Sequence, residues 1–172
     1  MKTLDFSNIP VFHGLDAAEL GKVQEIFREE TRPAGSIVVA EGQTGDEMFV
    51  LVKGRVQISK AMLMAGLSVP LLNMVSPRKV LATLDDAGHP VFGELALIDS
   101  DQRSATVTAV SDCTFLATSR ELFFGLATRE PELGVKLLLT LGRRMAATIR
   151  HSNMEVVKLT TALALSLRKT VF

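Results

Sequence analysis

The sequence predicts a mainly β protein: a jelly-roll barrel, or double-stranded β-helix, with an N-terminal helix and a long C-terminal helix. Two observations support this fold class. Short β-branched runs, separated by glycine-containing and polar turns, fill the middle of the chain. After Pro131, apolar residues instead recur every three or four positions, which indicates a helix. We therefore divide the chain into a barrel domain with its N-terminal helix over residues 1–130 and a C-terminal helix over residues 131–172.

The first helix is expected to begin after Asp16. This residue is a favourable N-cap, and Glu19 completes the pattern of a capping box three positions later. The apolar residues that follow lie at helical spacing: Leu20, Val23, Ile26 and Phe27. We therefore expect a capped amphipathic helix in front of the barrel.

Four β-rich runs are expected to form strands of the barrel: Ser36–Val39, Met48–Val52, Val56–Ser59 and Lys79–Leu84. The turns between them contain glycine. Gly42 and Gly45 lie in one six-residue connection, and Gly54 separates two strands. We expect positive φ angles at these glycines, because turns of this kind favour them.

The segment of residues 61–77 is rich in Met and Leu and is interrupted by Gly66, Pro70 and Asn73. One interpretation is a lengthened hairpin whose apolar residues pack on the barrel. The other is an exposed surface for a protein partner or a second subunit, because methionine side chains adapt to varied surfaces. The sequence leaves both interpretations open.

The segment of residues 92–107, FGELALIDSDQRSATV, predicts a site for a phosphate ester. Gly93 and Glu94 open a run long enough for about one helical turn, whose first amides are free to bind an anion. Arg103 adds a charged, planar fork suited to phosphate oxygens, and the small residues after it leave room for a ligand. The β-branched run from Thr106 to Val110 then indicates a strand.

This segment resembles the phosphate-binding cassette of cyclic nucleotide-binding domains, of the type found in the catabolite activator and in regulatory subunits of cAMP-dependent protein kinase. A second stretch, EGQTGDEMFVLVKGRVQIS at residues 41–59, resembles the other hallmark of this family. The two patterns are independent of each other and occur in the expected order. The resemblance covers about residues 6–150.

The resemblance implies that Arg103 pairs with the cyclic phosphate and that Glu94 accepts a hydrogen bond from the ribose 2′-hydroxyl. Further contacts are expected around the phosphate, from Gly93, Leu95, Ala96, Ser104 and Ala105. The ligand would be cAMP or cGMP, with cAMP favoured, and no other cofactor is expected. Alignment with relatives through the long helix places Ser152 and Asn153 near the purine; the alternative is that both are solvated polar residues.

The C-terminal helix is expected to extend from about Pro131 to Lys169. Its stripe of apolar and small residues favours pairing with the same helix of another copy, as in a two-stranded coiled coil. The stripe comprises Leu138, Leu141, Met145, Ile149, Ser152, Val156, Leu159 and Leu163. Bacterial relatives form homodimers in this way, and the resemblance implies the same here. The alternative is a helix folded back on its own barrel.

Other classes of function find no support in the sequence. Nineteen basic and nineteen acidic residues give a formal net charge of +0, which offers no electrostatic argument for nucleic-acid binding. The three histidines lack the spacing of a metal site, and no nucleophile–base motif is present, so we expect neither a metal site nor an enzyme. Without a signal peptide or a membrane span, a cytoplasmic protein is predicted, with its single Cys113 buried.

The expected function is therefore a cyclic nucleotide sensor that acts in signal transduction. Relatives that regulate transcription continue into a helix-turn-helix domain, and nothing in this sequence after position 170 is expected to supply its recognition helix. The alternative is a cyclic nucleotide-binding-like fold that has lost its ligand and serves as a dimerisation or protein-docking module.

Overall fold

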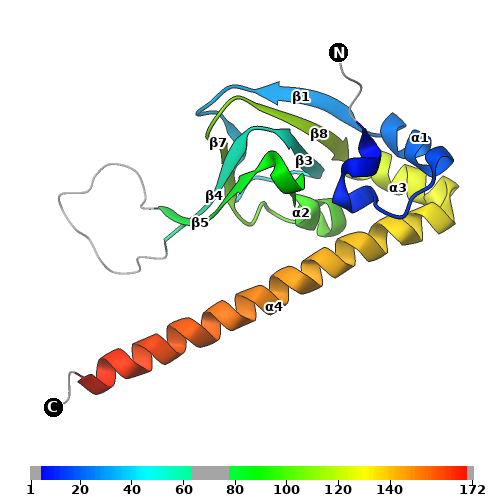
Figure 1. Ribbon diagram of the computed structural model, residues 1–172. Coiled ribbons are helices and arrows are strands. Elements are labelled where there is room, and N and C mark those ends of the chain that lie inside the picture. Colours follow the sequence, from blue (N-terminus) through cyan, green and yellow to red (C-terminus); the bar gives the residue numbers. More distant parts are fainter. Residues whose placement is uncertain (1–4, 63–77, 170–172) are drawn as a thin grey trace.

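The structure is a computed structural model that describes residues 5–62 and 78–169. Its core is a barrel-like pair of antiparallel sheets with four strands each (Figure 1), so the predicted mainly β class is confirmed. One sheet has the order β1 (Arg28–Arg32), β8 (Cys113–Ser119), β3 (Glu47–Lys53) and β6 (Val91–Phe92). The other has the order β2 (Ile37–Val39), β7 (Thr106–Ala109), β4 (Arg55–Ala61) and β5 (Arg78–Asp85).

Two groups of buried apolar residues hold this architecture together. Between the sheets, the rings of Phe49 and Phe92 stack with centroids 5.4 Å apart, and the ring of Phe115 meets both edge-on. The second group lies between the first sheet and the helices, and includes Leu97 and Leu116. Cys113 is buried, as predicted.

The helices lie mainly at one end of the barrel (Figure 1). Two short 3-10 turns, η1 (Phe6–Asn8) and η2 (Pro10–Phe12), precede α1 (Ala17–Glu25). Asp16 and Glu19 form the predicted capping box, since each side chain accepts a hydrogen bond from the backbone N–H of the other residue. After the barrel, α3 (Arg120–Arg129) begins at the N-cap Ser119.

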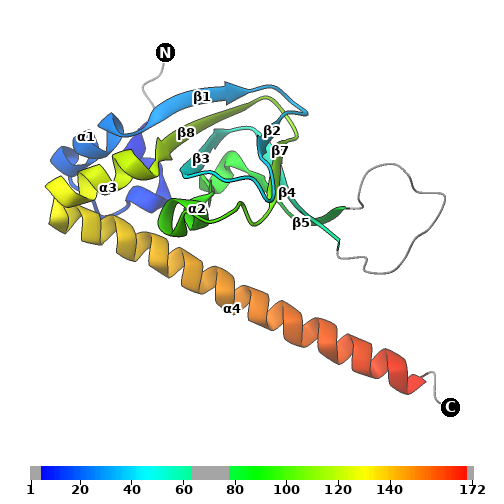
Figure 2. The ribbon, with the colours of Figure 1, turned by 180° about the vertical axis from the view of Figure 1, so that it is seen from behind.

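The C-terminal helix α4 (Pro131–Lys169) has the predicted extent. Its first part packs on the barrel's own helical layer, where Leu133, Leu137 and Leu141 are buried. Its second part runs beyond the barrel (Figures 1 and 2), and residues 156–167 are all exposed. Leu141 was predicted to belong to the apolar stripe that pairs with another copy. That prediction is wrong for Leu141 within this chain, because its side chain fills the chain's own core.

Strand β1 was not predicted, because its sequence REETR is charged and mostly exposed. Its pairing with β8 from Arg28–Ala117 to Arg32–Cys113 makes it a strand. The hairpin of β4 and β5 is paired up to Ala61 and Arg78. The predicted insertion at residues 61–77 lies outside the described residues from position 63 on, so both interpretations of it stay predictions. No helix in the described part of the chain has the length and hydropathy needed to cross a membrane.

Candidate ligand-binding site

A cavity of about 450 Å³ lies between the barrel and α4, beside the short helix α2 (Glu94–Asp99). Figures 1 and 2 both show α2 on the side of the barrel that faces α4. Strands β4 and β5 supply apolar walls through Ile58, Ala82 and Leu84. All seven residues predicted from the cassette line it: Gly93, Glu94, Leu95, Ala96, Arg103, Ser104 and Ala105. Pockets of this size bind small ligands of nucleotide dimensions.

Arg103 is the buried cation of this cavity, with 8% of its surface exposed. Its Nη1 donates to the carbonyl oxygen of Glu47 at 2.7 Å and to that of Gly93 at 3.3 Å. These are its only side-chain hydrogen bonds within the described residues, so the protons on Nε and Nη2 are available to a ligand. Burial lowers the pKa of the guanidinium, while the carboxylates of Glu47 and Asp46 oppose this shift. An arginine nevertheless stays charged at neutral pH.

The turn at residues 41–46 fixes the backbone of Arg103. Gly42 donates its N–H to the carbonyl oxygen of Arg103, and Arg103 donates its N–H to that of Gln43, both at 2.9 Å. The predicted positive φ is confirmed at Gly42 and Gly54, with values of 79° and 103°. The prediction of a positive φ is wrong for Gly45.

Two glycines enclose the guanidinium of Arg103. A Cβ atom added to Gly45 would lie 2.7 Å from Nε, and one added to Gly93 would lie 2.9 Å from Nη1. Gly93 also has a φ of 82°, which disfavours any side chain there. The space around the arginine therefore depends on the absence of a side chain on both sides.

Glu94 lies at the first position of α2 and is partly buried. Burial raises the pKa of its carboxyl; its own backbone N–H and the positive charge of Arg144 oppose the shift. A carboxylate at the edge of an apolar cavity is a suitable acceptor for a ligand hydroxyl. Since burial disfavours the charged form of this carboxyl, a hydrogen bond donated by a ligand would stabilise it.

Helix α4 closes the cavity with residues that were not predicted as site residues: Arg144, Thr148 and His151. The sequence could not identify them, because helix periodicity does not show which turn of α4 passes the cassette. Ser152 and Asn153, which were predicted, are exposed and do not line this cavity. Their contact with a ligand stays a prediction.

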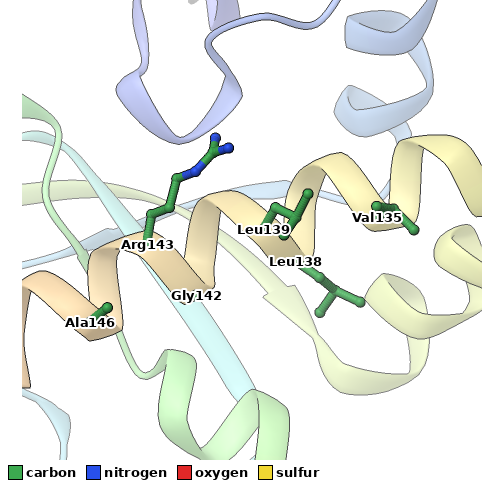
Figure 3. A pocket seen from close by; sticks show the side chains of 6 residues that line it. All are labelled: Val135, Leu138, Leu139, Gly142, Arg143 and Ala146. Carbon is green, nitrogen blue, oxygen red and sulfur yellow. The ribbon is translucent and has the colours of Figure 1, made fainter.

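A second hollow, of about 440 Å³, follows the outer face of α4 (Figure 3). Its lining contains one charged residue, Arg143, and is otherwise formed by apolar residues and glycine: Val135, Leu138, Leu139, Gly142 and Ala146. Farther along α4, Leu159 and Leu163 are apolar residues that are each 60% exposed. Such a face differs chemically from the cassette cavity and suits contact with another apolar surface.

The described residues contain no cluster of three or more His, Cys, Asp or Glu side chains that could hold a metal ion. His89 lies in a turn with a φ of 41°, and its Nδ1 is 3.2 Å from the carbonyl oxygen of Leu51.

Comparison with known proteins identifies the family. Residues 29–130 match the model of the cyclic nucleotide-binding domain. A cyclic nucleotide-gated potassium channel of Rhizobium etli is 32% identical over 132 residues, which are 73% of this chain and 30% of the channel. The cyclic AMP receptor protein of Thermus thermophilus is 29% identical over 147 residues, which are 86% of this chain and 60% of the receptor.

The fold comparison agrees. The crystal structure of the Thermus thermophilus catabolite activator protein superposes with a TM-score of 0.72 and 26% identity, covering 88% of this chain and 63% of that one. The chain thus spans less than two thirds of the length of these relatives. Together with the cassette residues around Arg103, the match shows that this chain belongs to the cyclic nucleotide-binding domain family.

Proposed function

We propose that this chain is a cytoplasmic sensor of cyclic nucleotides in signal transduction, with cAMP as the favoured ligand. The observation that carries the proposal is the buried Arg103, whose Nε and Nη2 protons lack a protein acceptor within the described residues. It lines the same cavity as Glu94, so one cation and one carboxylate are available to a single ligand. A relative named as a cyclic AMP receptor supports the choice of cAMP.

In this proposal each part of the nucleotide has a partner of matching chemistry. The cyclic phosphate lies on Arg103, with the hydroxyl of Ser104 as an additional donor. The ribose 2′-hydroxyl donates to Glu94, which relieves the cost of burying that carboxylate. The base extends toward α4, where Thr148 and His151 offer hydrogen-bonding groups.

We further propose a homodimer that forms through α4. Its outer apolar face, with the hollow in Figure 3, is the surface that a second α4 would cover. In such a dimer, Ser152 and Asn153 lie on the exposed part of α4. The base of a nucleotide bound by one copy is then within reach of these residues from the α4 helix of either copy. No contact with DNA, a membrane or a catalytic substrate is part of this proposal.

Thermal unfolding with a panel of ligands tests the function. A ligand at one hundred times its Kd adds about 2.7 kcal/mol to the free energy of unfolding. For a chain of this size, we expect cAMP to raise the Tm by about 5 to 10 °C, cGMP to raise it less, and 5′-AMP to leave it unchanged. If no cyclic nucleotide changes the Tm at millimolar concentration, the protein is not a sensor but a docking module with this fold.

A further inference from the structure

The short cassette helix α2 is held at both ends by arginines from outside it. At its first end, Nη1 of Arg103 donates to the carbonyl oxygen of Gly93, the N-cap residue. At its other end, Nη1 of Arg120 donates to the carbonyl oxygens of Leu97 and Ile98, both at 2.5 Å. Cationic side chains bind the free carbonyls at a helix C-terminus favourably. The position of α2 is therefore fixed by two guanidinium groups.

Arg120 is in turn firmly attached to other elements. It is the first residue of α3, and its backbone N–H donates to the carbonyl oxygen of Asp46 at 3.0 Å. Asp46 precedes Glu47, whose carbonyl oxygen accepts from Arg103. The guanidinium carbon of Arg120 also lies 4.6 Å from the ring centroid of Phe124, within the range of a cation–π contact. Arg120 thus links α3 to two segments that also contact Arg103: its side chain binds α2, and its backbone binds the residue before Glu47.

Helix α3 is closely packed on α4. At their crossing, a Cβ atom added to Gly134 would lie 2.7 Å from the Cβ of Ala127. Leu97 of α2 is fully buried in the same core as Leu137 of α4. A displacement at the end of α2 therefore meets close-packed side chains, which respond by moving together rather than by compressing.

From this arrangement we infer that Arg120 is a positioning residue: it aligns α2 for the ligand and transmits ligand binding to α3. The inference rests on the proposed function. A phosphate bound by Nε and Nη2 of Arg103 draws the guanidinium toward itself, which weakens the longer of the two hydrogen bonds from Nη1, the one to the carbonyl oxygen of Gly93. Releasing that end lets α2 turn about its other end, which Arg120 holds. The change then reaches α3 through the residue that begins it.

The test compares wild type with Arg120→Gln, Arg120→Lys and the control Arg129→Gln. Arg129 is an exposed arginine in the last turn of the same helix, so its variant loses the same charge without affecting α2. Calorimetry gives the Kd for cAMP, and hydrogen exchange at saturating cAMP gives the response of residues 93–106 and 120–129. We expect Arg120→Gln to bind about tenfold more weakly. Its α3 amides should no longer respond to cAMP, while residues 93–106 still do.

Arg120→Lys should restore part of the response, because an ammonium can reach one of the two carbonyls. A full α3 response in Arg120→Gln at saturating cAMP would overturn the inference while leaving the proposed function intact. If wild type and Arg129→Gln bind no cyclic nucleotide, the proposed function fails and the inference fails with it. If circular dichroism shows that Arg120→Gln is unfolded, Arg120→Lys takes its place, because lysine keeps the charge and most of the side chain. A reduced α3 response in Arg120→Lys then supports the inference, and a full response overturns it.

Discussion

Gly45→Ala is predicted to weaken ligand binding by displacing Arg103, although residue 45 lies far from the cassette in sequence. The added Cβ atom would lie 2.7 Å from Nε, 2.9 Å from Nη2 and 3.0 Å from the guanidinium carbon. Ordinary contact begins at 3.4 Å, so Nε must move by about 0.7 Å. Since Gly45 has no positive φ, alanine introduces no backbone strain there.

The arginine cannot simply move aside. Gly93 and the carbonyl oxygen of Glu47 lie on its other side, and Nη1 already donates to Glu47 at 2.7 Å. The shift therefore misaligns Nε and Nη2, the donors that the proposal assigns to the phosphate. A hydrogen bond to a charged group contributes about 1.5 to 3 kcal/mol, so losing one lowers affinity by about tenfold to a hundredfold.

Calorimetric titration with cAMP measures this change in Kd. Gly21→Ala in α1 is the matched control, because an added Cβ there has nothing within 4 Å. The control should keep the wild-type Kd, and circular dichroism should show that both variants are folded. An unchanged Kd in Gly45→Ala would refute the reasoning that the two glycines hold the phosphate-binding arginine in place.

Three further predictions concern the pH dependence of ligand binding, the packing of α4 on the core, and the proposed dimer. The affinity for cAMP should fall as pH decreases from neutrality through the raised pKa of Glu94, because the charged carboxylate accepts from the ribose hydroxyl more strongly than the neutral carboxyl does. Glu94→Gln should bind more weakly and lose this pH dependence in calorimetry. Leu141→Ala, at a side chain 1% exposed, should cost about 2 to 5 kcal/mol in denaturant unfolding, whereas Leu122→Ala, at a side chain of α3 that is 48% exposed, should cost less than about 0.5 kcal/mol. If the proposed α4 homodimer forms, Leu163→Glu should convert it to a monomer in light scattering, whereas Thr161→Glu, about half a turn away on α4, should not.

Much of the fold could be predicted because its signals are local. The capping box of Asp16 and Glu19 requires only residues three apart, and Pro131 marks the start of α4 by its tolerance at a first helical position. The cassette residues were identified for the same reason, since a short contiguous segment contains both Glu94 and Arg103. In the structure, both residues line one cavity.

The features that the sequence did not show depend on distant partners. Strand β1 exists because β8 pairs with it, and its charged residues carry no strand signal of their own. Arg120 has the same local setting as any arginine at a helix start; its role depends on carbonyls of α2, 22 and 23 residues earlier. In the sequence, Gly45 is indistinguishable from an ordinary turn glycine. In the structure, its lack of a side chain leaves space for the guanidinium of Arg103, 58 residues later.

The central claim is that Arg103 binds a cyclic phosphate in this cavity. Calorimetric titration of wild type and Arg103→Ala with cAMP tests it most directly, with circular dichroism to show that both proteins are folded. We expect saturable binding to wild type and a loss of affinity of about tenfold to a hundredfold or more in the variant. Absence of binding to wild type, or equal affinity in the two proteins, would contradict the claim.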